Sequence, residues 1–312
     1  MKPTLSILAL CHNHAHYIDE ALESLKNLDC KWVEIWIADD ASEDNSPEIL
    51  RNWERQKPDW NFVFQNENLG NCQTFNRLLE KCSGEFVIDF ATDDILLPSN
   101  LANWVQKLKA NPRAGFCYAN ALIFKDEIKK SELFSLKVNL KKMPEGYILD
   151  TLLGRPYICP PAVLFRRSAL LKVKGYNTLL AYEDLDIWLR ISKDFEVVYF
   201  PDPVVYYRKH SKSMSASLFL HRNERILQST LRIVESIWNW DAFKNGPPAM
   251  VRFLKYHLKI ASILQFPVEA NKFYECLERL NAESFADKCW KRVSISWFPF
   301  SKIFCWWKRI NF

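Results

Sequence analysis

The chain has 312 residues, of which 48% are hydrophobic and 25% are charged, and its formal net charge is +5. These values describe a globular protein with a sizeable core, built as one large α/β domain with an appendage or as two domains. No apolar run reaches the ~18 residues that a membrane-spanning helix needs. The sequence contains neither GxGxxG nor GxxxxGK[ST], which excludes the usual dinucleotide and P-loop sites.

The positive charge is concentrated at one end of the chain. Residues 288–312 contain six cations and no acid, so the remaining residues are nearly neutral overall. We therefore expect no nucleic acid partner for the main body of the protein. Nine cysteines are scattered without a CxxC pair, which favours free thiols over a zinc site or a disulfide framework. Met1 leads directly into a strand-like run without a signal peptide pattern, so a cytoplasmic location is expected.

Strands and helices alternate over the first part of the sequence. Apolar runs of strand-forming residues are found at 5–10, 33–38, 61–64 and 86–90, and apolar residues recur at helical spacing between them. Pro47 lies where a helix begins, and Gly84 lies where another ends. Alternation of this kind predicts an α/β fold with a doubly wound, mostly parallel sheet.

The later part of the chain changes from mixed to helical patterns. A helix from Pro98 to about Lys109 precedes strands at 115–119 and 162–167, and another helix begins near Glu183. Two short strands, 197–200 and 204–207, are expected on either side of Pro201 and Pro203, and residues 124–148 are expected to form a loop or an edge hairpin. Beyond residue 215 the pattern is helical, as in the spacing of Phe273, Cys276, Leu277 and Leu280. We expect an α/β domain over 1–215 and a helical region over 216–312.

Two of the expected strands end in a pair of adjacent acids. The pairs are Asp39-Asp40 and Asp93-Asp94. Ligands of open α/β sheets bind outside the carboxyl ends of the strands. Adjacent carboxylates repel each other unless a cation offsets their charge, and Mg²⁺ or Mn²⁺ prefers such oxygen ligands. Turn formation or helix capping explains one pair alone, whereas two pairs in one sheet favour a ligand site. The histidines at 12, 14 and 16 have a poor spacing for a metal site.

Six segments, taken in order, resemble the landmarks of family 2 glycosyltransferases. They are residues 5–13, 38–42, 68–70, 91–94, 183–188 and 207–210. The resemblance covers roughly residues 4–215 and implies the GT-A fold, a Rossmann-like, mostly parallel sheet flanked by helices. It implies a nucleotide-sugar half over 1–115 and an acceptor half over 116–215. The helical region 216–312 would be a C-terminal extension.

The resemblance also implies an activity of the bacterial surface-glycan type. Such enzymes move a hexosyl or N-acetylhexosaminyl group from a nucleotide diphosphate sugar, here a UDP-sugar, to a hydroxyl with inversion, assisted by Mn²⁺ or Mg²⁺. The implied acceptor is a glycan or a polyprenyl-linked glycan. The alternative is a catalytically inactive nucleotide-sugar-binding protein, or a membrane-recruited subunit of a glycan-assembly complex. Ala91 stands where the metal motif commonly begins with Asp, and Leu10-Cys11-His12-Asn13 replaces the common Pro-Thr-Tyr-Asn.

Carried over residue by residue, the resemblance assigns roles to positions in this sequence. Nucleotide-sugar binding falls to Leu10, His12, Asn13, Asp40 and Asp93; metal binding to Asp93, Asp94 and His210; the general base to Asp184; and acceptor binding to Glu183, Asp186 and Trp188. Each has an ordinary structural alternative: a turn-forming Asp40, an N-capping Asp184 with Glu183 or Asp186 as the base, a solvated His210 and a core Trp188. We expect the start of a helix to keep Asp184 ionised.

The C-terminal residues 288–312 interleave aromatic side chains with the six cations, and Pro299 interrupts the run. Aromatic and basic side chains together suit a membrane surface that bears anionic lipids. The alternative is that the aromatic side chains pack on the catalytic domain. Under the first interpretation the protein is peripheral on the inner face of the cell membrane.

Overall fold

The computed structural model describes all residues except 1–2, 126, 139, 141, 155–156, 211–223, 244 and 296–312. By its contacts the chain divides into two units. The first unit comprises Met1–Ile148, Pro156–Thr178 and Glu183–Lys209, and the second comprises Leu149–Arg155, Leu179–Tyr182 and His210–Phe312. The expected boundary at residue 215 lies outside the described residues.

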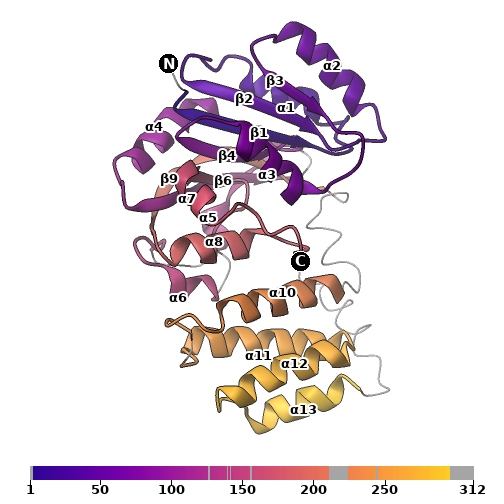
Figure 1. The fold of residues 1–312 in the computed structure, drawn as a ribbon, viewed down its shortest axis with the longest axis vertical. Helices are drawn as coiled ribbons and strands as arrows, with labels where there is room; N and C mark the ends of the chain where they lie inside the picture. Colours follow the sequence, from indigo (N-terminus) through magenta and orange to yellow (C-terminus); the bar gives the residue numbers. More distant parts are fainter. Residues whose placement is uncertain are drawn as a thin grey trace. The chain divides into compact units, whose positions relative to one another are not determined.

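The described strands of the first unit form one sheet with the order β3-β2-β1-β4-β8-β6-β9-β5, and β7 pairs with β6 (Figure 1). The strands are β1 (Leu5–Cys11), β2 (Val33–Asp39), β3 (Asn61–Phe64), β4 (Phe86–Ala91), β5 (Ile95–Leu96), β6 (Ala114–Phe124), β7 (Glu132–Leu133), β8 (Val163–Arg166) and β9 (Glu196–Arg208). Strands β1 to β4 are parallel, as are β6 and β9, whereas β8 runs antiparallel to both β4 and β6. The prediction of a mostly parallel α/β sheet is confirmed.

The longer helices of the first unit cover this sheet because each presents one apolar face. They are α1 (Ile18–Leu25), α2 (Ser46–Gln56), α3 (Asn71–Lys81), α4 (Pro98–Lys109), α5 (Phe134–Lys137), α7 (Arg167–Lys172) and α8 (Asp184–Ser192), with a 3₁₀ turn at Ile128–Lys130. In α1 the buried residues Ile18, Ala21, Leu22 and Leu25 recur at helical spacing. Pro98 starts α4, where a missing N–H costs no hydrogen bond. The core fixes the ends of β1, β2 and β4, where the candidate site lies.

Two segments between Phe124 and Arg208 test the predicted strands. β7 pairs antiparallel with β6, with Leu133 opposite Leu122, so the expected edge hairpin is confirmed. The expectation of two strands separated by Pro201 and Pro203 is wrong, because β9 is continuous. Its pairing with β6 passes from Ala119↔Phe200 to Asn120↔Pro203, so β9 has extra residues at this point. A bulge of this kind tolerates prolines that lack an N–H for the ladder.

The second unit is helical in its described residues. Its helices are α6 (Leu149–Leu152), α10 (Glu224–Ile237), α11 (Pro248–Ile263), α12 (Pro267–Arg279) and α13 (Phe285–Val293), of which α11, α12 and α13 lie side by side (Figure 1). Leu254 and Leu258 of α11 and Phe273 and Leu277 of α12 are fully buried. The expected helical extension is confirmed for these residues. No helix in the described part of the chain is long and apolar enough to cross a membrane.

Candidate functional site

The two acid pairs lie at one edge of the sheet. Strand β1 has β2 and β4 as parallel neighbours, with Cys11 opposite Asp39 and Leu10 opposite Ala91. Asp39-Asp40 and Asp93-Asp94 therefore follow strands on either side of β1, at the carboxyl ends where ligands of such sheets bind. This grouping is what the sequence predicted.

Asp40 is buried and holds the turn that follows β3. Its Oδ1 accepts hydrogen bonds from the backbone N–H of Leu69 at 2.8 Å and from Gln65 Nε2 at 3.0 Å. Its Oδ2 accepts the N–H of Gly70 at 2.8 Å, where a φ of 82° suits glycine. Both carboxylate oxygens are thus engaged by the chain, which is the turn-forming role. Asp40 therefore shapes this edge of the sheet from within.

His12 and Asn13 join the turns after β1 and β2. His12 Nε2 lies 3.2 and 3.1 Å from the amide nitrogens of Asn13 and Asn68, and its Nδ1 lies 3.0 Å from the Asp40 carbonyl oxygen. Nε2 therefore accepts and Nδ1 donates. Asn13, at φ 58°, accepts the N–H of Glu43 at 2.8 Å on its Oδ1. These contacts give the edge a fixed shape.

The neighbouring residues Leu10 and Asp39 differ from expectation. The Leu10 side chain is buried, and its carbonyl oxygen accepts both the N–H and the Oγ1 hydroxyl of Thr92 at 3.0 Å, so the predicted nucleotide contact has no group left to make it. Asp39, a member of the first acid pair to which no separate role was assigned, is buried. Its Oδ2 accepts the N–H of Ser42, and its Oδ1 has no hydrogen-bond partner among the described residues. A buried acceptor of this kind is costly unless a ligand or water completes it.

Asp94 is buried at the tip after β4, and the end of β9 contacts this tip. Burial and the adjacent Asp93 raise the pKa of Asp94 well above its usual range. Asp94 Oδ1 accepts the backbone N–H of Arg208 at 2.8 Å, and Arg208 Nε donates to the Asp93 carbonyl oxygen at 2.9 Å. The Arg208 guanidinium lies over the rings of Tyr17 and Phe124 and pairs with Glu20.

Lys209 adds a half-buried cation beside the same tip. Burial lowers the pKa of Lys209, whereas the charges of Asp94 and Asp93 raise it. Its Nζ donates to the Tyr207 hydroxyl at 2.8 Å. Arg208 and Lys209 lie in the 207–210 segment that resembles the family, but the sequence analysis assigned them no role. Their position at the end of an expected strand in that segment could have identified them as site residues.

The donor set for a divalent metal is small. Asp93 and Asp94 supply hard carboxylate oxygens, and the raised pKa of Asp94 shows that the pair lacks full compensating charge. Within the described residues, no group of three or more His, Cys, Asp or Glu side chains is placed to hold a metal ion. His210 follows β9 by two residues and belongs to the second unit. The acid pair fits a metal whose other ligands come from a diphosphate and water.

A second group of carboxylates surrounds the start of α8. Glu183 Oε1 accepts the amide of Asn71 at 2.8 Å, and Asp89 Oδ2 accepts the Tyr176 hydroxyl at 2.9 Å. Burial, then Glu183 and Asp89, raise the pKa of Asp184 well above its usual range. Burial also raises the pKa of Glu183, and burial with Glu183 raises that of Asp89 to about 7. Desolvation and two carboxylates therefore oppose the helix start, which the sequence analysis expected to keep Asp184 ionised.

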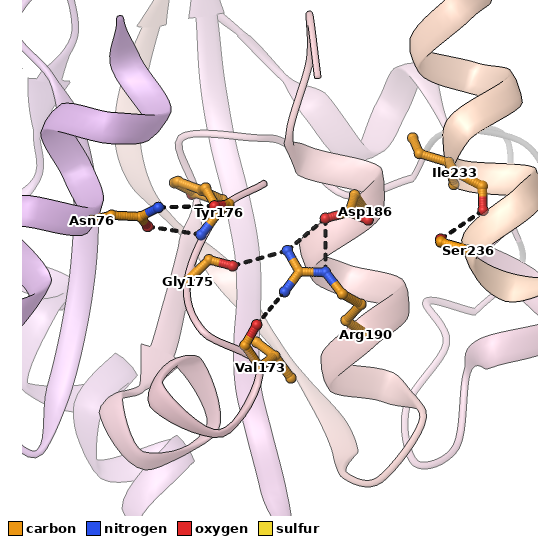
Figure 2. A network of polar contacts seen from close by, with 8 residues as sticks. All are labelled: Asn76, Val173, Gly175, Tyr176, Asp186, Arg190, Ile233 and Ser236. Atoms are coloured by element: carbon orange, nitrogen blue, oxygen red, sulfur yellow. Dashed lines mark hydrogen bonds and ion pairs between the residues drawn. The ribbon is translucent and has the colours of Figure 1, made fainter. Parts of the chain in front are cut away.

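Asp186 and Trp188 have packing roles in place of the predicted acceptor contacts. Asp186 is buried and forms an ion pair with Arg190 at 2.5 Å (Figure 2). Arg190 also donates to the carbonyl oxygens of Val173 and Gly175, at 2.6 and 2.9 Å. The Trp188 side chain is only 8% exposed. On α8, the residues left for chemistry are Glu183, just before the helix, and Asp184.

The two carboxylate groups converge on one buried residue. Burial raises the pKa of the Cys159 thiol well above its usual range, the charges of Asp94 and Asp184 raise it further, and Lys209 opposes them. Cys159 is fully buried. The geometric link between the two groups is β4, because Asp89 in this strand accepts the Tyr176 hydroxyl and Asp93-Asp94 follow its end.

Comparison with known proteins gives this arrangement a family. The model of "Glycosyl transferase family 2" matches residues 6–173. An uncharacterized protein of Mycobacterium bovis is 26% identical over 224 residues, covering 70% of this chain and 63% of that protein. The GalNAc(5)-diNAcBac-PP-undecaprenol beta-1,3-glucosyltransferase of Campylobacter jejuni is 26% identical over 285 residues, covering 88% of this chain and 87% of the relative.

Solved structures show the same fold at low sequence identity. TarS residues 1–349 of S. aureus, in complex with UDP-GlcNAc, has a TM-score of 0.62 at 16% identity, over 94% of this chain and 90% of that one. The mannosyltransferase PcManGT of Pyrobaculum calidifontis, in complex with GDP-Man and Mn²⁺, has a TM-score of 0.59 at 19% identity, over 93% and 78%. The fold is the GT-A fold. Since the family model spans more than half of the sequence and includes both acid pairs, the chain belongs to glycosyl transferase family 2.

Proposed function

We propose that this protein transfers a sugar from a UDP-sugar to a hydroxyl of a glycan or a polyprenyl-linked glycan, with inversion and with Mn²⁺ or Mg²⁺. The observation that carries the proposal is that both acidic groups lie along β4: Asp93 and Asp94 follow its end, and Asp89 within it accepts the Tyr176 hydroxyl of the group around α8. Glycosyl transfer needs carboxylates that hold a metal for the leaving diphosphate and another that takes the proton of the acceptor. The named activity of the C. jejuni relative and the donors bound to the two solved structures support it.

The turns after β1, β2 and β3 form the nucleotide edge in this proposal. His12, Asn13 and Asp40 hold these turns through their hydrogen bonds to one another and to the backbone. The unpartnered Oδ1 of Asp39 is an acceptor that a base N–H would satisfy. A rigid edge reduces the ordering cost of binding, since little of it has to be fixed by the ligand.

Asp93 and Asp94 would hold the metal. A bound divalent ion neutralises the charge that grows on the leaving diphosphate. Arg208 fixes the tip through its contacts to Asp93 and Asp94, and Lys209 adds a positive charge beside it. The metal motif of this chain has Ala91 in place of an acid. In this proposal the positive charge of Lys209 supplies part of the charge neutralisation that a bound metal ion provides.

Asp184 is proposed as the base that takes the proton of the acceptor hydroxyl. Burial and the neighbouring carboxylates raise the pKa of Asp184, so its carboxylate binds an abstracted proton more tightly. A general base works best when its pKa lies near the working pH, and the raised pKa moves Asp184 in that direction. Glu183 is held by Asn71, which leaves it a weaker candidate.

A donor screen with thermal unfolding tests the proposal. UDP should raise the unfolding temperature of the full chain only with Mn²⁺ or Mg²⁺ present, and Asp93→Asn or Asp94→Asn should remove most of that rise. Asp150→Asn, at an exposed position in α6, is the matched control. Equal stabilisation by UDP in EDTA would refute the metal site. Release of UDP with acceptor present distinguishes the transferase from an inactive nucleotide-sugar-binding protein, the alternative that Ala91 supports.

We also propose that residues 288–312 dock on an anionic membrane surface. Lys288, Lys291 and Arg292 lie on or beside the last described helix, α13, and residues 296–312 lie outside the described residues. The proposal rests on the interleaved aromatic and basic residues of the sequence. Flotation with anionic vesicles should recover the full chain and not a chain shortened before Lys288. Equal recovery of the two would contradict membrane docking.

A further inference from the structure

Helix α3 fixes two parts of the acid group around α8. Asn71 donates to Glu183, and Asn76 holds the backbone of Tyr176 twice, by accepting its N–H and donating to its carbonyl oxygen, both at 2.8 Å (Figure 2). Gly175 precedes Tyr176 at φ 65°, and a Cβ there would lie 2.2 Å from Asn76 Oδ1. The turn and α3 therefore fit each other without room for a side chain at residue 175.

Arg190 ties the same turn to α8. In Figure 2 its guanidinium reaches Val173 and Gly175 on one side and Asp186 on the other. Because Asp186 and Asp184 lie on one helix, these contacts fix Tyr176 relative to Asp184. The Tyr176 ring packs on Phe75, with centroids 4.4 Å apart, and its hydroxyl donates to Asp89 of β4.

Asp89 has no part in the reaction proposed above, and it lies in an otherwise apolar strand. Several groups surround Asp184: Glu183 beside it, Asp89 from β4, Cys72 from α3, Tyr176 from the turn, and Cys159. Burial raises the pKa of Cys72, of Tyr176 and of Cys159, so all three are neutral near pH 7. Burial and Glu183 raise the pKa of Asp89 to about 7, and burial also raises the pKa of Glu183.

We propose that Asp89, held by Tyr176, is a positioning residue that sets the pH range in which Asp184 acts as the base. The inference rests on the proposed function, since it concerns the base of that reaction. When Asp89 is ionised, its repulsion makes Asp184 harder to ionise and more basic once ionised. Protonation of Asp89 removes that repulsion. Asp89 and Asp184 therefore titrate as a coupled pair.

The decisive variant is Asp89→Asn, which removes the charge and keeps an oxygen that can accept the Tyr176 hydroxyl. The acid limb of the kcat–pH profile should move about one pH unit lower, as expected for the loss of one nearby like charge. The plateau should fall severalfold, because Asp184 becomes a weaker base. The KM for the donor should change less than about twofold, since no group in the nucleotide edge is altered. Asp194→Asn, which removes an exposed ion pair with Lys172, is the matched control.

Tyr176→Phe provides a second, independent variant. It keeps the packing on Phe75 but removes the hydroxyl that stabilises the Asp89 anion, so Asp89 stays protonated to higher pH. The acid limb should again move to lower pH, by less than in Asp89→Asn. An unchanged limb in a folded Asp89→Asn, or a shift to higher pH in Tyr176→Phe, would overturn the inference.

One further measurement separates this inference from the proposed function. Carbon-13 NMR of the Asp184 carboxyl group, identified by its loss in Asp184→Asn, follows the titration without any turnover. Its midpoint should be about one pH unit lower in Asp89→Asn. If that midpoint does not move, the inference fails whatever the activity. If it moves and the wild-type protein transfers no sugar, the proposed function fails while the coupling stands.

Discussion

Carboxylates in the nucleotide edge and at the start of α8 differ in the hydrogen bonds they receive and in the direction of their pKa shifts. Asp40 receives two backbone N–H groups and one side-chain amide. Asp44, in the same edge, is exposed, and hydrogen bonds from Ser46 and from the N–H of Ala15 hold its pKa below the usual range. Asp89 receives one hydroxyl, and burial with Glu183 raises its pKa to about 7.

The difference teaches what each region requires. Hydrogen bonds from N–H groups stabilise the charged form of a carboxylate, as at Asp44, whereas burial and a neighbouring carboxylate make that form costly, as at Asp89. The second arrangement suits the proton acceptor that is proposed at the start of α8. Asp94 lies between these cases, because it receives the N–H of Arg208 and still has a raised pKa. A divalent ion would supply the charge that it lacks.

The largest expected effect comes from removing the proton acceptor at the start of α8. Asp184→Asn should lower kcat by at least about 10²-fold, the low end of what general base catalysis contributes. UDP–metal binding should stay near the wild-type value, because the nucleotide edge is unchanged. Steady-state kinetics and thermal unfolding with UDP and Mn²⁺ measure the two effects separately.

Glu183→Gln is the matched control for that variant. Gln keeps an oxygen for the amide of Asn71, so the loss in kcat should be far smaller. If Glu183→Gln is the crippling change and Asp184→Asn the mild one, the base is Glu183.

The second-largest expected effect concerns Asp40 in the nucleotide edge. Asp40→Ala leaves the N–H of Leu69 without its acceptor, whereas the N–H of Gly70 keeps Asn68 Oδ1 at 3.0 Å. The loss of one such hydrogen bond costs about 1–3 kcal/mol, so the free energy of unfolding should fall by about that amount in urea titration. Asp150→Ala, at an exposed position, should change it by less than about 0.5 kcal/mol. Equal losses in the two variants would show that Asp40 does not hold the turn.

The sequence predicted those features of the site that depend on local pattern. The ends of β2 and β4 were readable because an apolar run stops at adjacent acids, and parallel pairing then brings both pairs to one edge. The continuity of β9 was not readable, since prolines in a strand are tolerated only when the partner strand accepts a bulge.

Features that depend on contacts between residues far apart in the sequence could not be predicted either. Asp89 reads as a polar position of a strand, and its significance appears only with Tyr176, which lies 87 residues later in the sequence. Likewise, Asp186 resembles a member of an acidic motif until Arg190 is seen to hold it. Secondary-structure propensity predicts which helix or strand carries a carboxylate. The pKa of that carboxylate depends on the groups that the rest of the fold packs around it.

The smallest expected effect extends the comparison to a base in the second unit. His257 of α11 packs against the rings of Phe253, Tyr256 and Phe273, with centroid distances of 4.2, 5.1 and 5.6 Å. Burial lowers its pKa from 6.5 to about 4. As with Asp89, burial here disfavours the charged form, but for a base that form is the protonated one.

The sign of the pH dependence follows from the two states of His257. In the unfolded chain it binds a proton below about pH 6.5, whereas in the folded protein it stays neutral down to about pH 4. Its contribution to stability is complete above the unfolded pKa and is lost as the pH falls from 6.5 toward 4. Between pH 7 and pH 5 the loss should be about 2 kcal/mol in urea titration of the full chain. His257→Phe keeps an aromatic ring in the same packing and cannot titrate, so its loss over this range should be smaller by that amount. An equal loss in the two proteins would assign the acid sensitivity to other groups, such as the Asp287 carboxylate that pairs with Lys255.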